Sequence, residues 1–554
     1  MPSRRLAQGS LRVTYPATHT LGRPQRDRDL GSSAEASHAA LLDSLGQSDF
    51  RFVEEVQITP KPARALDRAA AAAPDPVRIG LEVAAGEAAV VLVEQDGCYS
   101  WHLPAEFGPV TTARSMPRGQ ARRTVSFEIP LRHPAAPTRA SRRARSTSRT
   151  RGLFGDLLTG VLRVTVLRFA APVLVGKVID VLERFVHEGI VHMPSPDPTT
   201  WTRVDRLDQV GLPTGRPARV LLFVHGTFSS TASAYGVLGL TDEGRAFLTD
   251  ALARYDAVIG YDHKTLSVDP LANANDLLGR IGGVTSGVTV DVVCHSRGGL
   301  VVRSFAEQLL PSSGWNGSVD KVVFVAATNA GTNLANPERW HDLVDIVTNL
   351  TMVTAGVVAG LPGGAPVSAV VVGVVKGLGA LVKYLVSYAA DSHGGIPGLA
   401  AMTPGGPFVT GINQTQPGQP APGTPWYVVS SNFHVTLQDL DHLPKDFPRE
   451  LAVRLAEGLV DRIFRDDNDL VVDVWSMSSI DAAVGGFVAD TYSFGTNSEI
   501  YHVNYFGDPR FVAALRSWLL AARARGVGRG RSRGPARGRG PGPRAGRAGK
   551  AASP

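Results

Sequence analysis

Apolar and polar positions follow two different rhythms along this chain, and the change of rhythm divides it. Between Arg51 and Leu131, short runs such as VRIGLEV, AAVVLVE and TVSFEIPL alternate with a period of two residues, which predicts a small β-rich module over 49–132. From Arg219 onward, apolar runs of strand length alternate with segments of helical period: RVLLFVHG, DAVIGYDH, TVDVVCHS, KVVFVAATN and PWYVVSSN. Strands that alternate with helices predict the α/β class, with a mostly parallel sheet flanked by helices.

The segments outside these two regions carry weaker patterns. Residues 1–48 are polar and rich in Ala and Ser, so we expect them to be disordered. Residues 152–188 form an apolar, helix-like stretch whose charged side chains argue against a membrane span, and we expect this stretch to pack on the following domain. Near the C-terminus, Asp508-Pro509 supplies an N-cap and a first-turn proline for a last helix.

The positive charge is concentrated in two short segments. Residues 523–554 hold nine arginines and one lysine, and the linker 133–151 holds six arginines, with no acidic residue in either. The whole chain has a net charge of +7, so subtracting these sixteen charges leaves −9 for the rest. Both segments are too poor in apolar residues to fold alone. Since the tail has no aromatic side chain to stack on bases, we do not expect nucleic acid as a partner.

Cysteine content and the N-terminus bear on location and cofactors. Cys98 and Cys294 are the only cysteines and match neither a disulfide framework nor a zinc spacing. The first residues show no apolar run behind their arginines, so we expect no secretory signal and a cytoplasmic protein. An EF-hand reading of the acidic stretch after Asp466 fails, because Leu470 and Val471 stand where an oxygen ligand and a glycine are needed. We expect no metal and no cofactor.

The run TVDVVCHSRGGLVVR suggests a nucleophile at Ser296. Its centre is close to G-x-S-x-G, the sharp turn between a strand and a helix that exposes a serine, but Cys294 stands where the first glycine is usual. Cysteine is small enough to fit there at a modest packing cost, and Gly298 meets the second requirement. The pattern alone is also compatible with a serine that merely turns a corner, so partners decide its meaning.

A nucleophilic serine needs a histidine as base and a carboxylate to orient that histidine, and in α/β-hydrolases the chain order is Ser, Asp or Glu, then His. His502 is the only histidine beyond the acidic stretch RDDNDLVVDVWSM and is the expected base. Within that stretch we choose Asp469, because the apolar residues after it suit a buried loop end, and keep Asp473 as the alternative.

Two backbone amides are expected to hold the developing oxyanion. One is that of Arg297, directly after the serine. The other follows the His-Gly pair of FVHGTFSST and belongs to Thr227, with Phe228 as the alternative. His225 is interpreted as a structural residue that shapes this loop rather than as the base.

Five segments in this order, FVHGTFSSTASAYG, YDHKTLSVDPLANANDLL, VVCHSRGGLVVR, ATNAGTNLANPERW and PGLAAMTP, resemble the bacterial lipase-like α/β-hydrolase domain found beside CHAT (caspase-like) domains. The resemblance spans about residues 215–522. It implies an α/β-hydrolase fold and a Ser-Asp-His triad, and it leaves the substrate open. No caspase-like Cys/His arrangement is visible in this chain.

Residues 346–390 are expected to form a helical lid over the site. Val367 to Tyr388 is long enough to cross a bilayer, but Lys376 and Lys383 lie on one helical face, which favours a lid with its lysines toward water and its apolar side toward the site. Leu361-Pro362-Gly363-Gly364 would be the bend between two lid helices. A pair of core-packing helices is the plainer alternative.

Two functions remain open from sequence. The first is a serine hydrolase that cleaves small-molecule or lipid esters of apolar acids. The second is a catalytically silent hydrolase fold that serves as an interaction module, with the basic tail binding a partner. Contact with a membrane surface and the identity of a protein partner are left undecided.

Overall fold

The structure is a computed structural model that describes residues 1–520, except for 24–32, 62–74, 106–121, 132–159, 172–182, 184–185, 360–366, 389–394, 415–423, most of 437–465, and 481–487. The arginine-rich linker, the basic tail and the predicted bend at 361–364 lie outside the described residues. Among the described helices, none is both long and apolar enough to cross a bilayer.

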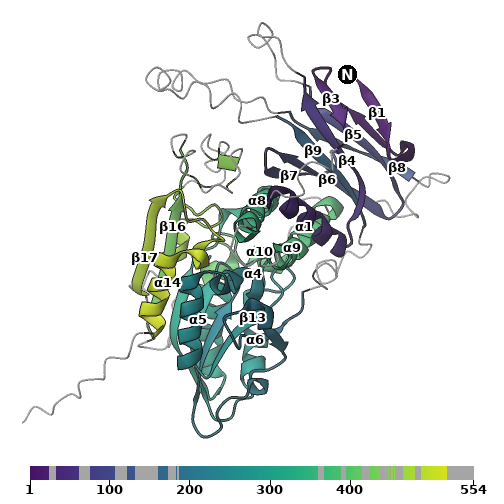
Figure 1. Cartoon of the computed structure of the whole chain (residues 1–554). Helices are drawn as coiled ribbons and strands as arrows, with labels where there is room; N and C mark the ends of the chain where they lie inside the picture. Colours follow the sequence, from purple (N-terminus) through teal and green to yellow (C-terminus); the bar gives the residue numbers. More distant parts are fainter. Residues whose placement is uncertain are drawn as a thin grey trace, which may run out of the picture.

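The C-terminal part is built on one eight-stranded sheet of order β11-β10-β13-β12-β14-β15-β16-β17 (Figure 1). The strands β13, β12, β14, β15, β16 and β17 are parallel to one another. The antiparallel pair of β10 and β11 forms one edge of the sheet. Its strands are β10 (Gly189–His192), β11 (Thr202–Val204), β12 (Ala218–Val224), β13 (Ala257–Asp262), β14 (Val288–His295), β15 (Gly317–Val325), β16 (Trp426–Phe433) and β17 (Val488–Asn497). The predicted α/β class is confirmed.

Helices cover both faces of this sheet, because its central strands are apolar on both sides. The helices after the first sheet strands are α4 (Thr231–Tyr235), α5 (Asp242–Arg254), α6 (Pro270–Ile281), α7 (Gly298–Arg303), α8 (Trp340–Ala359), α9 (Val367–Tyr388), α10 (Pro397–Ala400), α11 (Pro407–Ile412), α13 (Val474–Ser478) and α14 (Pro509–Leu515). We name α8 and α9 the cover helices. The helices α5 and α14 pack in one core cluster with the cover helices, on one face of the sheet. Helix α6 packs in a second cluster on the opposite face. Asp508 caps α14 by accepting hydrogen bonds from the next helical amides, as predicted.

The N-terminal part is a sandwich of two antiparallel sheets around its own apolar core. The first sheet contains β1 (Ser3–Leu6), β2 (Leu11–Thr14), β5 (Val77–Ala84) and β8 (Arg122–Ile129). The second contains β3 (His19–Gly22), β4 (Arg51–Pro60), β9 (Leu162–Ala170), β6 (Glu87–Gln95) and β7 (Cys98–His102). The second sheet is buried on both faces, because its far side packs in the same cluster as α1 (Ser33–Gln47) and the cover helices.

Two sequence-based expectations for this N-terminal part are wrong. Residues 1–48 contain three strands and α1 rather than disorder, since β2 pairs with β5 some seventy residues later and β3 pairs with β4. Within 152–188, Leu162–Ala170 forms the strand β9 rather than a helix. This strand lies between β4 and β6 and is apolar toward both faces, so the two-residue alternation that marks a half-buried strand is absent.

Candidate functional site

Ser296 occupies a sharp turn between β14 and α7. Its φ angle is +55°, a left-handed conformation that a non-glycine residue rarely adopts and that clusters at functional sites. The helix begins close to a neighbouring strand: a Cβ at Gly298 would lie 2.4 Å from the carbonyl oxygen of Val224. Glycine at this position is therefore a steric requirement, and it allows the strand–turn–helix geometry expected from the sequence.

Cys294 points away from this turn. It is fully buried in the core on the face of the sheet opposite to Val293, and its Sγ lies 3.5 Å from the carbonyl oxygen of Val323. Burial raises the pKa of this thiol well above its ordinary value, which keeps it protonated and poorly nucleophilic. The residue that departs from the glycine pattern is thus a packing residue.

His502 lies in a loop before α14 and is held by Asp469. The His502 Nδ1 atom is 2.9 Å from Asp469 Oδ2, and the amide of His502 also donates to the carbonyl oxygen of Asp469. Asp469 is fully buried; its Oδ1 accepts the amides of Val471 and Val472, and its Oδ2 accepts the Tyr505 hydroxyl at 3.1 Å. These bonds fix the carboxylate and leave the Nε2 atom of His502 free of Asp469.

The alternative carboxylate, Asp473, has a different environment. Its Oδ2 accepts a long hydrogen bond of 3.4 Å from Asn333, and its buried Oδ1 has no partner among the described residues. Burial, together with the nearby charge of Asp466, raises the pKa of Asp473 to about 6. The structure therefore brings Asp469, and not Asp473, to His502.

The loop after β12 passes directly beside Ser296. A Cβ at Gly226 would lie 2.6 Å from the Cβ of Ser296, so only glycine allows this approach. The amide of Phe228 is already used, because it donates to the Thr265 hydroxyl at 3.2 Å. For the amides of Thr227 and Arg297, no acceptor is found among the residues that the structure describes. Of the three expected oxyanion donors, these two are available.

Sequence reasoning missed the support of this loop. The buried carboxylate of Glu183 accepts the amides of Thr265, Leu266 and Ser267 at 2.6–2.9 Å, and so fixes the segment whose threonine holds Phe228. Phe228 itself has a φ of +56°. Glu183 stands in a stretch with no recognisable motif, so nothing local in the sequence could have identified it.

His225 is a structural residue, in agreement with the sequence interpretation. Its Nε2 accepts the amide of His263 at 3.2 Å, so its proton resides on Nδ1, which faces the carbonyl oxygen of Gly226 at 2.9 Å. The two imidazoles stack with centroids 4.2 Å apart, and burial lowers the pKa of each. The neutral His225 ring uses both of its nitrogens in hydrogen bonds, so it fixes the loop and has no free nitrogen for a substrate.

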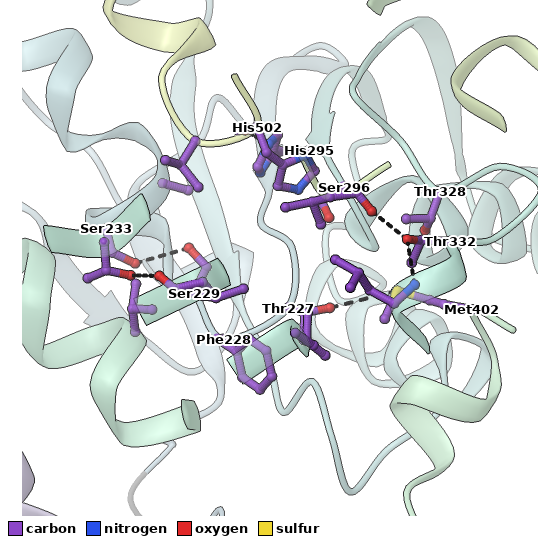
Figure 2. A pocket seen from close by; sticks show the side chains of 18 of the residues that line it. Thr227, Phe228, Ser229, Ser233, His295, Ser296, Thr328, Thr332, Met402 and His502 are labelled. Carbon is purple, nitrogen blue, oxygen red and sulfur yellow. Dashed lines mark hydrogen bonds between the residues drawn. The ribbon is translucent and has the colours of Figure 1, made fainter. Parts of the chain in front are cut away.

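Ser296 and His502 line one cavity, with Thr227 and Phe228 across from them (Figure 2). The cavity has a volume of about 90 Å³. Twelve of its twenty-two lining residues are apolar and eight carry a hydroxyl group; the cover helices contribute Leu343, Val347, Thr351, Thr354 and Val374. Within the described residues, no group of three or more His, Cys, Asp or Glu side chains is arranged to hold a metal ion.

The expectation that the lysines of the cover helices face water is wrong for Lys383. Lys383 does not face water: its side chain is 7% exposed, its ammonium donates to the carbonyl oxygen of Ser48, and it lies 4.8 Å from the ring centroid of Phe50. Lys376 is half-buried. The outer side of α9 is covered by the N-terminal sandwich, which the helical pattern alone could not reveal.

Several solved structures are similar to parts of this chain. Lipase 1 from Pelosinus fermentans has 14% identity and a TM-score of 0.38, and the match covers 55% of this chain and 99% of that one. EstA from Clostridium botulinum has 13% identity and a TM-score of 0.35, covering 62% and 96%. Naproxen esterase (carboxylesterase NP) from Bacillus subtilis has 13% identity and a TM-score of 0.29, also covering 62% and 96%.

Family models match the two structural parts separately. No curated protein matches the chain significantly in sequence. The resemblance to the hydrolase domain found beside CHAT domains therefore stays a prediction. Residues 8–169, which hold most of the sandwich, match a domain of unknown function, DUF7362. Residues 188–520, which hold the eight-stranded sheet, the cover helices and Ser296, match a second, DUF7379. By this match over more than half of its length, the chain belongs to the DUF7379 family.

Proposed function

We propose that this protein is a serine hydrolase of the α/β-hydrolase type that cleaves carboxylic esters of apolar acids. The observation that carries the proposal is the combination of Ser296 in a strained turn with His502 in the same cavity, where His502 is bonded to a buried Asp469. A serine that merely turned a corner would need neither the strain nor an oriented histidine.

In the proposed reaction, the Ser296 oxygen attacks the ester carbonyl carbon while the Nε2 atom of His502 takes its proton. Asp469 holds the Nδ1–H and stabilises the imidazolium that forms. The amides of Thr227 and Arg297 donate to the oxyanion of the tetrahedral intermediate. His502 then returns the proton to the leaving alkoxide. In the second half of the reaction, water attacks the acyl-enzyme while His502 takes a proton from the water, and His502 then gives this proton to the Ser296 oxygen as the acid leaves.

The cavity wall supports the choice of an apolar acid. Apolar side chains make up just over half of its lining residues, and no carboxylate, lysine or arginine is among them. A bound methylene group gains at most about 0.8 kcal/mol from leaving water. Nitrophenyl esters from acetate to laurate test this point: kcat/KM is expected to rise by about one to two orders of magnitude from butyrate to octanoate. A flat or falling series would point to a small polar acid.

A fluorophosphonate probe separates this proposal from the silent interaction module. The parent protein should label, with the adduct on Ser296, and Ser296→Ala should not. If the folded parent protein fails to label and hydrolyses none of the esters, the enzyme proposal is wrong and the interaction module is favoured.

A further inference from the structure

Helix α9 lies between the N-terminal sandwich and the part of the chain that holds the eight-stranded sheet (Figure 1). Two of its glycines show this directly. A Cβ at Gly377 would lie 2.9 Å from the ring of Phe228, and a Cβ at Gly379 would lie 3.0 Å from the ring of Phe50. Residues two apart in a helix point in nearly opposite directions, because each residue turns the helix by about 100°. One side of α9 thus touches the site, and the other touches the sandwich.

Helix α8 is tied to the edge strand of the sandwich. β7 is the last strand of its sheet, so one side of its backbone has no strand partner within that sheet. Asn349 takes that place: its side chain accepts from the amide of Tyr99 and donates to the carbonyl oxygen of Tyr99, both at 2.8 Å. Asp345 accepts the amide of Trp101 at 2.8 Å, and Thr348 accepts the Trp101 indole N–H at 2.9 Å.

The cover helices close the cavity in this conformation. Ser296 and His502 are each only 5% exposed, and four of the residues that line the cavity with them, Leu343, Val347, Thr351 and Thr354, belong to α8. Enzyme pockets for small molecules commonly have volumes of about 300–1,000 Å³, well above the 90 Å³ enclosed here. An ester with a long acyl chain therefore needs the cover helices to move away from Ser296.

We propose that the N-terminal sandwich is a latch for this site: it holds α8 and α9 over Ser296, and substrate enters when the contact between sandwich and cover helices separates. The inference rests on the proposed hydrolase function. It gives the sandwich a role in controlling access, through the Asn349 and Lys383 contacts described above.

The chemistry of the contact suits a reversible latch. The bonds of Asn349 and Asp345 go to backbone groups of an edge strand, and that of Thr348 goes to the Trp101 indole; water can replace each of them when the parts separate. Lys383 donates to the carbonyl oxygen of Ser48, and water can satisfy both groups when the parts separate. The buried aromatic rings of Phe50 and Trp101 favour the closed state in water.

A disulfide between Ser48→Cys and Gly379→Cys would lock the latch in the full-length protein. A Cβ at Gly379 would be 3.7 Å from the Cβ of Ser48, within the range of natural disulfides, and the ring of Phe50 needs to yield by a few tenths of an ångström. After oxidation, kcat/KM for nitrophenyl octanoate should fall at least about tenfold, and reduction should restore it. Each single variant, oxidised in the same way, is the control and should keep its activity.

A second variant loosens the latch instead of locking it. Asn349→Ala removes both bonds to the Tyr99 backbone, and kcat/KM for octanoate should rise about threefold to tenfold. The matched control is Ser100→Ala on the same strand, because the Ser100 hydroxyl contacts His102 and not α8. This control should leave the rate unchanged.

The outcomes separate the latch from the hydrolase. If the parent protein hydrolyses the ester and labels at Ser296, while the oxidised double variant is equally active, the latch is wrong and the hydrolase stands. Unchanged activity in Asn349→Ala would count against the latch in the same way. If the parent neither labels nor hydrolyses, both proposals fall.

Discussion

Gly226→Ala is expected to disable the site with little effect on the fold. The new Cβ would lie 2.6 Å from the Cβ of Ser296 and 3.1 Å from its Oγ, whereas carbon atoms in contact prefer about 3.5–4.0 Å. Relief requires a relative displacement of about 1 Å between the loop that carries the Thr227 amide and Ser296. A misplacement of about 1 Å in a catalytic arrangement can lower the rate about a hundredfold.

The assay is kcat/KM for nitrophenyl butyrate together with the rate of fluorophosphonate labelling, and both should fall about a hundredfold. Overpacking should cost about 1–3 kcal/mol, a decrease of a few degrees in Tm. Gly279→Ala is the matched control: this exposed position in α6 has no atom within 4 Å of the new Cβ, so activity should be unchanged and stability equal or slightly higher. A folded Gly226→Ala protein with the activity of the parent would refute the close approach and the oxyanion role of the loop.

Other substitutions test the remaining roles. Ser296→Ala should lower hydrolysis at least about a thousandfold, whereas Cys294→Ala should keep activity; the opposite pattern would make the cysteine the nucleophile. Asp469→Asn should lower kcat far more than Asp473→Asn, because only Asp469 bonds His502; equal losses would contradict the assignment. For stability, the folded pKa of Asp473 is about 6 and lies above its unfolded value, so the native state binds more protons and stability falls as pH rises from about 4 to 6. Asp473→Asn should remove this decrease, so its Tm relative to the parent should be higher at pH 8 than at pH 4; a pH-independent Tm difference would show that Asp473 does not titrate in this way.

Five strands of the eight-stranded sheet, β12 to β16, could be predicted because their signals are local. Each apolar run is long enough to fill a strand buried on both faces, and polar residues such as His263 and Ser296 follow where the strands end. The strands β10 and β11 are too short, and β17 too exposed, to give such a signal. The order of Ser296, Asp469 and His502 along the chain also gave a short list of candidates. Geometry was still needed to separate Asp469 from Asp473, since four aspartates share one short stretch.

The N-terminal sandwich could not be predicted over its full extent because its signals are not local. The strands β1, β2 and β3 have only four residues each, and they are stabilised by partners that come much later in the chain, as in the pairing of Leu11 with Leu81. The burial of Lys383 has the same origin. Its helix predicts an exposed cation, and only the distant Ser48 carbonyl oxygen and the Phe50 ring make a buried position favourable.

The departure at Cys294 has a physical explanation in the alternation of β14. Side chains of successive strand residues point to opposite faces, so Val293 packs on the face of the cavity while Cys294 packs in the core on the other face. The steric demand for glycine lies elsewhere: a Cβ at Gly298 would meet Val224, and one at Gly299 would lie 2.6 Å from the Cβ of Ala327. These two glycines let α7 start close to its neighbours, while the position two residues before the serine needs only a small side chain that fits the far core. The cysteine is therefore compatible with a nucleophilic serine, because the space that it fills is not part of the cavity.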